Sequence, residues 1–348
     1  MTRVLIAGLG NMGFSHALAH HNHPAAEIVG LVNRSGRPAK APLDGYPVFT
    51  DFRRALAEIK PDLAVIATYS DSHADYAVAA FEAGCDVFVE KPLATTVADA
   101  ERVVSAAKAA GKKLVIGYIL RHHPSWIRLI AEARKLGPPY VFRMNLNQQS
   151  SGPTWDVHRA LMQTTPPIVD CGVHYVDVMC QITDAKPVEV RGMGLRLSDE
   201  IAPDMYNYGH LQVIFDDKSV GWYEAGWGPM ISETAFFVKD VMSPKGSVSI
   251  VMDPNAKSDD IDTHTKTSVI RLHSAETGPD GRFIRPDEDM TMAGEPGHQE
   301  LCDFEQAYML KAIREDIDLS RHMDDAVQSL RICLAADESA RTGKPIYL

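Results

Sequence analysis

The chain has 348 residues with ordinary hydrophobic and charged fractions, and this length exceeds what one hydrophobic core usually serves, so we expect two domains. The formal net charge of −11 argues against a nucleic-acid or anionic-membrane partner, and no apolar stretch is long enough to span a bilayer. Five widely spaced cysteines without a CxxC pair favour reduced thiols in a cytoplasmic protein, with neither a disulfide framework nor a metal site.

The first third of the chain alternates short apolar strands with helical patterns. Strands are predicted at residues 3–8, 27–33, 47–50, 63–67, 86–89 and 113–117. Helices are predicted at 12–20, 52–59, 74–83 and 97–110, with Asp51 as an N-cap and glycines after the last two. Continuous apolar strands separated by helices are typical of a parallel sheet covered on both faces. We therefore predict an α/β, doubly wound domain over residues 1–122.

The pattern changes after about Pro124. A helix at 125–135 and a strand at 140–147 are followed by a strand-rich stretch. Its predicted strands are 188–197, 208–215, 220–226, 235–241, 247–251 and 268–272. Two long helices are predicted at 298–315 and 324–341. Residues 123–348 are thus expected to form an α+β domain with a large open, mostly antiparallel sheet, whose C-terminal helix packs back on the first domain.

A glycine-rich turn follows the first predicted strand and precedes the first predicted helix. It reads Gly8-Leu9-Gly10-Asn11-Met12-Gly13, which is GxGxxG in the context that a Rossmann dinucleotide site requires. Gly8 permits the tight turn, Gly10 lets a pyrophosphate approach the backbone, and Gly13 lets helix and strand pack closely. The free N–H groups of the helix start then face the phosphates. The alternative is a purely structural turn.

The residues after the second strand bear on the choice between NAD and NADP. An acidic residue there commonly holds the adenosine ribose, but this chain has Asn33, then Arg34, Ser35 and Arg37. Asn33 can bond a ribose without repelling a 2′-phosphate, and Arg34 can pair with such a phosphate or stack on adenine. The alternative is a solvated basic loop. The expected cofactor is therefore NAD or NADP.

Two clusters carry candidate chemistry. Lys91 follows the fifth strand, at the sheet edge where ligands of open α/β sheets bind, and its ammonium can stabilise developing negative charge. Asp170 and His174 are four residues apart, and on one helix they would share a face and form an acid/base pair, with Asp177 on the same side. A surface lysine, a packed core histidine or an intrahelical hydrogen bond are the alternatives.

With these residues in hand, the chain resembles the Gfo/Idh/MocA oxidoreductase family. The matching segments are residues 8–13, Glu90-Lys91-Pro92, residues 170–174 and residues 336–345, in an order that covers essentially the whole chain. The resemblance implies a Rossmann domain followed by an open-sheet domain, with homodimers or homotetramers formed through the sheet. It also implies catalytic roles for Lys91, Asp170 and His174, with His174 as the acid/base.

The resemblance extends the list of expected site residues. It implies that Thr68 and His73 line the cofactor cleft, and that Arg121 and His123 lie near the nicotinamide. The expected cofactor-binding residues are Gly8, Gly10, Asn11, Met12, Gly13, Asn33, Arg34, Thr68, His73, Glu90 and Lys91. The expected substrate-binding residues are Lys91, Arg121, His123, Trp155, His158, Asp170 and His174. Trp155 and His158 have the alternative of being ordinary loop residues.

The expected function is hydride transfer between NAD(P) and a hydroxyl or carbonyl of a sugar, inositol or sugar derivative. One departure from the family pattern is Pro166-Pro167 before the Asp170 segment, where glycines are usual, so the pocket shape is expected to differ. Two other functions stay open: a non-catalytic NAD(P)-binding regulator, and a glycoside-cleaving enzyme that retains its cofactor.

Overall fold

The structure is a computed structural model and describes residues 1–348 except 38, 235, 260–264 and 266. These residues divide into two compact units, each treated separately below. The first unit comprises Met1–His122 and Pro296–Leu330, and the second comprises His123–Glu295 and Arg331–Leu348. Helix α10 (Ser320–Thr342) therefore contributes residues to both units.

The first unit contains a sheet of six parallel strands in the order β3-β2-β1-β4-β5-β6. The strands are β1 (Thr2–Ala7), β2 (Ala26–Val32), β3 (Val48–Phe49), β4 (Leu63–Ile66), β5 (Asp86–Glu90) and β6 (Leu114–Gly117). This confirms the predicted doubly wound parallel sheet. The strand order reverses between β1 and β4, and ligands of such sheets bind beyond the carboxyl ends of strands at this point.

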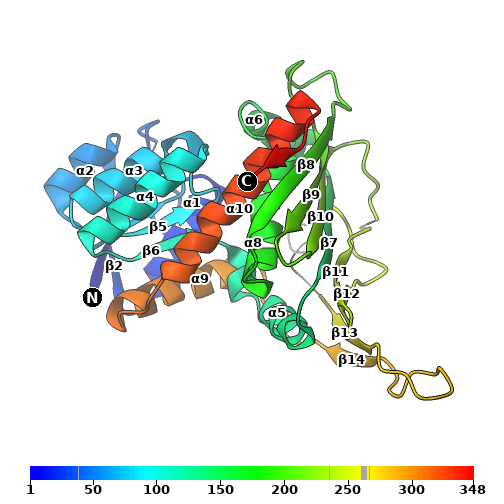
Figure 1. The fold of residues 1–348 in the computed structure, drawn as a ribbon. Coiled ribbons are helices and arrows are strands. Elements are labelled where there is room, and N and C mark those ends of the chain that lie inside the picture. The colour runs from blue at the N-terminus through cyan, green and yellow to red at the C-terminus, as the bar shows by residue number, and fades with distance from the viewer. Residues whose placement is uncertain (38, 235, 260–264, 266) are drawn as a thin grey trace. The chain divides into compact units, whose positions relative to one another are not determined.

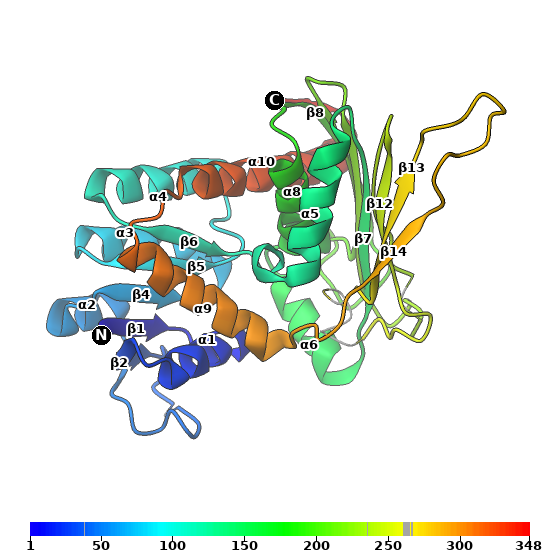
Figure 2. The same ribbon diagram turned by 90° about the horizontal axis from the view of Figure 1, so that it is seen from below.

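Helices cover both faces of this sheet. They are α1 (Asn11–Asn22), α2 (Phe52–Ile59), α3 (His73–Glu82), α4 (Val97–Ala110) and α9 (His298–Arg314), with 3₁₀ turns η1 (Ser70–Ser72) and η2 (Ile119–His122). Helix α1 packs against α9 on one face, as Figure 2 shows, while α3 packs against α2 and α4 on the other. The predicted caps are present: Asp51 accepts the Arg54 N–H at the start of α2, and Gly111 ends α4 in the left-handed conformation.

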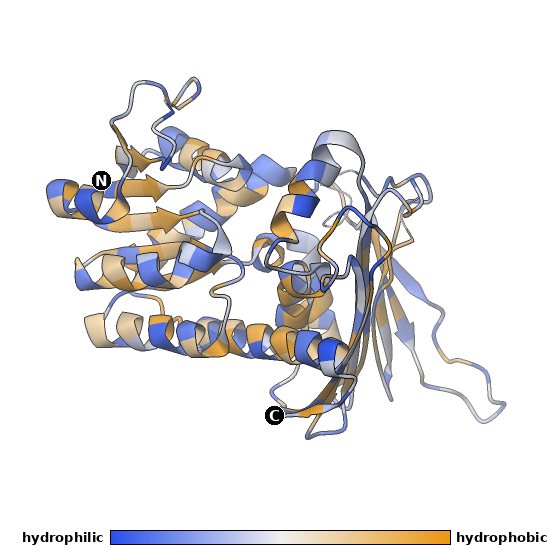
Figure 3. Cartoon of the chain, turned by 90° about the horizontal axis from the view of Figure 1, so that it is seen from above, coloured by the Kyte–Doolittle hydropathy of each residue, from blue (hydrophilic) through white to orange (hydrophobic). Residues whose placement is uncertain are grey.

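The core of the first unit explains why α9 belongs to it. The strands are almost entirely apolar and buried, and Figure 3 shows them in the hydrophobic colours. Met309 and Leu310 of α9, with Leu319, join the buried cluster formed by strand residues such as Val4 and Val65. Burying these side chains stabilises the unit by about 1.5–3 kcal/mol each. Among the described helices of the whole chain, none is both long and apolar enough to cross a membrane.

The second unit is built on a nine-stranded sheet in the order β14-β13-β12-β11-β7-β10-β9-β8-β15. Only β7 and β10 pair in parallel, so the predicted mostly antiparallel sheet is confirmed. The strands are β7 (Val141–Gln149), β8 (Pro187–Leu195), β9 (Tyr208–Phe215), β10 (Val220–Gly228), β11 (Lys239–Ser243), β12 (Gly246–Val251), β13 (Val269–Ser274), β14 (Glu288–Thr291) and β15 (Ile346–Tyr347). The predicted strand 235–241 includes Ala235, which lies outside the described residues.

Helices pack on one face of this sheet. They are α5 (Pro124–Leu136), α6 (Gly152–Leu161), α7 (Pro167–Asp170) and α8 (Gly172–Ile182). Helices α6, α7 and α8 contact β10, and α5 contacts β11 and β12. The residues of β10 alternate accordingly, with Tyr223 and Ala225 buried and Trp222 and Glu224 only partly so. Figures 1 and 2 show no helix of the described chain on the opposite face of the sheet.

Candidate functional site

The turn between β1 and α1 is shaped by its three glycines. Gly8 has a φ of +94°, and a Cβ on it would lie 2.2 Å from the Ala67 carbonyl oxygen. A Cβ on Gly13 would lie 2.1 Å from the Gly8 carbonyl oxygen, whereas one on Gly10 would meet no described atom within 4 Å. Helix α1 starts here with no side-chain cap on Gly10 and no acidic residue in its first turn. This cradle fits the pyrophosphate of a dinucleotide.

The loop after β2 is organised by Asn33. Its Nδ2 donates to the Arg37 carbonyl at 3.0 Å, and its Oδ1 accepts from the Ser35 hydroxyl at 2.9 Å. Arg34 and Arg37 are exposed, and the segment 33–37 carries no acidic side chain. The loop therefore presents two cations and a hydroxyl where a dinucleotide's adenosine ribose commonly lies.

His73 links the loops that follow β4 and β5. It is 1% exposed, with Nδ1 2.8 Å from the Pro92 carbonyl oxygen and Nε2 3.1 Å from the Thr68 carbonyl oxygen. Burial lowers the pKa of His73. Thr68 directs its hydroxyl to that of Ser72 at 2.7 Å. The ring of His73 thus lies between backbone carbonyl oxygens of the two loops, and a neutral ring donates its single N–H to one of them.

Lys91 follows β5 at the carboxyl edge of the parallel sheet, the edge at which the glycine turn follows β1. Its backbone N–H donates to Oε2 of Glu90 at 3.1 Å. The other oxygen of Glu90, Oε1, lies 2.6 Å from Nε2 of His16 on α1. Burial acts to raise the pKa of Glu90, but the hydrogen bond of His16 and the charge of Lys91 outweigh it and lower that pKa. Glu90 is therefore a buried anion directly before Lys91.

Arg121 and His123 have defined structural partners. Arg121 donates to Oδ2 of Asp325 at 2.9 Å within the first unit, and Arg321 donates to the other oxygen of that carboxylate. In the second unit His123 is fully buried at the start of α5, where its Nδ1 accepts the Ser125 backbone N–H. Burial is the main cause that lowers the pKa of His123 to about 4. It is therefore a neutral ring near pH 7.

Asp170 and His174 lie on two short helices rather than one. Asp170 ends α7 and His174 is in the first turn of α8, with Cys171 between the two helices. The Cys171 N–H bonds the carbonyl of Pro167 four residues back, but the His174 N–H bonds that of Cys171, only three residues back. The condition of one regular helix, under which the two side chains would share a face, is therefore not met at this point. Asp170 is buried and His174 partly buried.

The segment with Trp155 and His158 is helical. The two residues lie on α6, so reading them as ordinary loop residues was wrong. Both are buried, and the ring of His158 stacks on that of Trp227 at 4.3 Å with an interplanar angle of 9°. Trp227 on β10 was not singled out from the sequence. It lies one residue beyond the predicted strand 220–226, and continuing the period-two alternation of Tyr223 and Ala225 by one step is the signal that could have found it.

A second group of aromatic residues was also missed by sequence reasoning. Tyr175 of α8 stacks on Tyr223 of β10 at 5.0 Å and meets Trp126 of α5 edge-on at 5.7 Å. Neither tyrosine hydroxyl has a hydrogen-bond partner within the described part of the chain, and burial raises both pKa values well above the ordinary range. The charge of Asp170 acts on Tyr223 in the same direction. These neutral hydroxyls lie beneath the α7–α8 segment.

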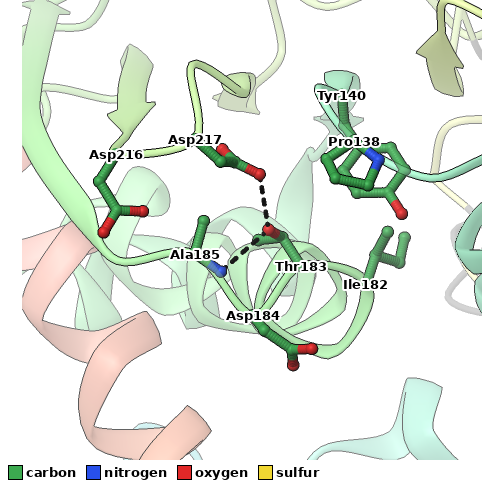
Figure 4. Close-up of a pocket in the computed structure, with 8 residues that line it drawn as sticks. All are labelled: Pro138, Tyr140, Ile182, Thr183, Asp184, Ala185, Asp216 and Asp217. Carbon is green, nitrogen blue, oxygen red and sulfur yellow. Dashed lines mark hydrogen bonds between the residues drawn. The ribbon is translucent and has the colours of Figure 1, made fainter.

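One surface pocket of about 270 Å³ lies elsewhere in the second unit. Figure 4 shows it at the C-terminal end of α8 and the turn between β9 and β10. Its lining residues are Pro138, Tyr140, Ile182, Thr183, Asp184, Ala185, Asp216 and Asp217. It contains none of the candidate site residues.

Two family models match consecutive parts of the chain. Residues 2–118 match the NAD-binding Rossmann fold of the Gfo/Idh/MocA oxidoreductase family, and residues 126–234 match the C-terminal domain of the same family. The chain belongs to this family. The first unit therefore carries the NAD-binding domain of an oxidoreductase, in agreement with the expected NAD or NADP cofactor.

Relatives of the Gfo/Idh/MocA chain include named sugar and polyol enzymes. Inositol 2-dehydrogenase of Salmonella paratyphi B is 30% identical over 182 residues, which is 50% of this chain and 52% of that protein. The chain thus spans about half the length of the named relatives it matches. Structures of scyllo-inositol dehydrogenase from Lactobacillus casei and aldose-aldose oxidoreductase from Caulobacter crescentus share the fold. Their TM-scores are 0.76 and 0.75, at 18% and 21% identity, over 100% and 99% of this chain and 99% of each of those chains.

Proposed function

We propose that this family member transfers a hydride between NAD(P) and a hydroxyl or carbonyl carbon of a sugar, inositol or sugar derivative. The observation that carries the proposal is the position of Lys91. It lies beyond β5 at the sheet edge where the open glycine turn receives the dinucleotide. The inositol dehydrogenases among the relatives support a polyol or sugar as substrate.

Three residues carry the acid/base work in this proposal. The bound nicotinamide accepts or gives the hydride. His174 takes the proton of the substrate hydroxyl during oxidation and returns it during reduction. Asp170 orients the ring of His174, and the Lys91 ammonium stabilises negative charge on the substrate oxygen. Trp155 and His158 form a wall for the sugar face, with Arg121 and His123 as further substrate-binding residues.

The cofactor site is proposed to accept the 2′-phosphate of NADP. Arg34 and Arg37 are exposed on the loop after β2, and the segment 33–37 that holds them has no carboxylate to repel a phosphate. The amide of Asn33 is bonded within the loop and adds no negative charge. Replacing Arg34 by serine should therefore weaken the binding of NADP more than that of NAD.

The experiment is a reduction assay with purified protein. NAD⁺ or NADP⁺ is mixed with a panel of inositols, aldoses and sugar derivatives, and the absorbance of the reduced nicotinamide is followed. Lys91→Ala and His174→Ala are expected to lose about 100-fold or more in rate. Lys108→Ala is the control, because Lys108 is an exposed lysine of α4 away from the sheet edge. The same assay with Arg34→Ser measures the cofactor preference.

The outcomes separate the three candidate functions. Reduction that both active-site variants lose supports the dehydrogenase. Dinucleotide binding without turnover across the panel favours the regulator. A sugar product that forms while the cofactor shows no net reduction favours an enzyme that retains its cofactor. Reduction that survives both substitutions contradicts the assigned catalytic residues.

We also propose that the open face of the nine-stranded sheet joins copies of the chain in a homodimer or homotetramer. The strand alternation places Trp222, Ile214 and Val220 on this face, and the latter two are 39% and 38% exposed. Met193 and Leu195 of β8 extend the apolar surface. Apolar side chains gathered on an uncovered face indicate a protein–protein contact.

A further inference from the structure

A chain of buried polar side chains runs from α9 to the residue before Lys91. Gln306 of α9 lies between two histidines of α1, with its Nε2 2.9 Å from Nδ1 of His16 and its Oε1 2.8 Å from Nε2 of His20. Nε2 of His16 lies 2.6 Å from Oε1 of Glu90, whose Oε2 accepts the Lys91 N–H. His16, His20 and Gln306 are at most 1% exposed.

The amide of Gln306 fixes where the protons of this chain lie. Its nitrogen only donates and its oxygen only accepts, so Nδ1 of His16 is an acceptor and Nε2 of His20 a donor. His16 then carries a proton on Nε2, directed at Glu90. The carboxylate of Glu90 receives this donor and the Lys91 N–H, and such bonds stabilise the ionised form of a buried carboxylate.

Two buried carboxyl groups in this region have opposite charge states. Glu90 is held as the anion by the donors just described. Neither oxygen of Glu305, on α9, has a hydrogen-bond partner among the residues that the structure describes. Burial, with the charge of Glu90, raises the pKa of Glu305 well above its ordinary value, which favours the neutral form of Glu305. The titratable groups that act on or are acted on by Glu90 are His16, His73, Lys91, Cys302 and Glu305.

Two further observations concern the cluster around Glu90. Gly117 on β6 pairs with Glu90, and a Cβ there would come within 3.1 Å of Oε1, so this glycine leaves room for the carboxylate. His16, Cys302 and Glu305 also bring three possible metal-ligand atoms within 4.8 Å of one another. An ion would have to displace a hydrogen bond of His16, since both its ring nitrogens are already bonded. The hydrogen-bonded chain therefore accounts for His16 without an ion.

We propose that His16 and Gln306 are positioning residues for Lys91. They hold the ionised carboxylate of Glu90 in place, and Glu90 fixes the backbone N–H of Lys91 and keeps a negative charge beside it. The inference rests on the proposed function, which assigns Lys91 to catalysis. The test of this inference requires no enzyme turnover, so a failure of the inference can be distinguished from a failure of the proposed function.

The test measures the charge state of Lys91 in the full-length protein without added dinucleotide. An amine-specific reagent is applied over a pH series, and labelling of Lys91 is read by peptide mass spectrometry. His16→Phe keeps the edge-on packing against Phe88 but removes both hydrogen bonds. We expect the labelling midpoint to move about one pH unit lower, because the Glu90 carboxylate is no longer held in place beside Lys91 and stabilises its ammonium less. His16→Gln, which retains a donor, should label like wild type.

The matched control is His322→Phe. His322 is a buried histidine of the same unit whose Nε2 accepts the backbone N–H of Ile116 on β6, so its loss perturbs packing beside the same strand but removes neither of the donors to Glu90 described above. Its labelling midpoint should equal that of wild type. If His16→Phe does not fold, Gln306→Met carries the test and should shift the midpoint in the same direction. A folded variant of either residue with the wild-type midpoint overturns the proposal.

Discussion

Substitutions at two glycines of the turn after β1 should separate an effect on dinucleotide binding from an effect on folding. Alanine at Gly13 would place Cβ 2.1 Å from one backbone oxygen and 2.8 Å from its carbonyl carbon, closer than real Cβ atoms approach. Alanine at Gly10 would meet no described atom within 4 Å, and the φ of −71° and ψ of −169° at this position suit any residue. We expect Gly13→Ala to lose stability and Gly10→Ala to lose dinucleotide binding.

The magnitudes follow from these contacts. Overpacking against backbone at Gly13 costs about 1–3 kcal/mol, even with the better helix propensity of alanine. For a unit of this size that lowers the melting temperature by roughly 2–4 °C per kcal/mol. At Gly10 the weaker capping by alanine, a few tenths of a kcal/mol or more, is offset by about 0.4–1 kcal/mol of lost unfolded-state entropy. A methyl group in the open cradle should raise the dinucleotide Kd at least tenfold, which is about 1.4 kcal/mol.

The assay combines thermal melting followed by circular dichroism with titration of the reduced dinucleotide, followed by its fluorescence. Gly45→Ala is the control, because a Cβ there also meets no described atom within 4 Å and the residue lies outside the turn. It should match wild type in both measurements. The reasoning is refuted if Gly10→Ala melts as low as Gly13→Ala, or if it binds the dinucleotide as tightly as wild type.

Two further predictions concern the second unit. Burial lowers the pKa of Lys239 to about 7, so the unfolded chain binds more protons than the folded one above that pH. The free energy of unfolding should rise with pH from about 7 towards 10, by at most about 1.4 kcal/mol per pH unit. Denaturant unfolding measures this rise, and the variant Lys239→Met should lack it. Equal pH dependence in both proteins would contradict the prediction. Trp222→Glu on the open sheet face should lower the molar mass measured by light scattering, whereas Phe283→Glu, 60% exposed outside the nine strands, should not. An unchanged mass for Trp222→Glu would refute the proposed oligomer face.

Much of the fold could be predicted because its signals are local. Helices α2 and α4 have the predicted bounds, since a side-chain cap starts each one and left-handed residues end both. Helix α6 and strand β14 were missed. The α6 segment begins with Gly152-Pro153, a pair that is typical of a turn. Strand β14 is too short to show a recognisable hydrophobic alternation. The break at Cys171 was missed because Pro166-Pro167 start a separate short helix there.

The candidate site, like the fold, contains residues that could be located from the sequence and residues that could not. The glycine turn and Lys91 could be located because each follows a strand that is recognisable by itself. The partners of those residues could not be located. Gln306 lies 290 residues from His16, and Asp325 lies 204 residues from Arg121, so no spacing rule connects them. Tyr223 could be assigned to a strand, and Trp227 lies one residue beyond that predicted strand. Neither could be assigned to particular partners, because stacking depends on which helix covers the strand.

The dinucleotide-binding unit depends on buried polar partners that lie far apart in the sequence. The buried charge of Glu90 depends on His16, and the proton position on His16 depends on an amide of α9. Removing that amide would leave buried ring nitrogens without partners, each costing about 1–3 kcal/mol. Met309 and Leu310 of the same helix contribute to the apolar core beside it. Helix α9 thus supplies both apolar packing and hydrogen bonds at the edge of the sheet near Lys91, although the last of the six strands ends at Gly117 and α9 begins only at His298.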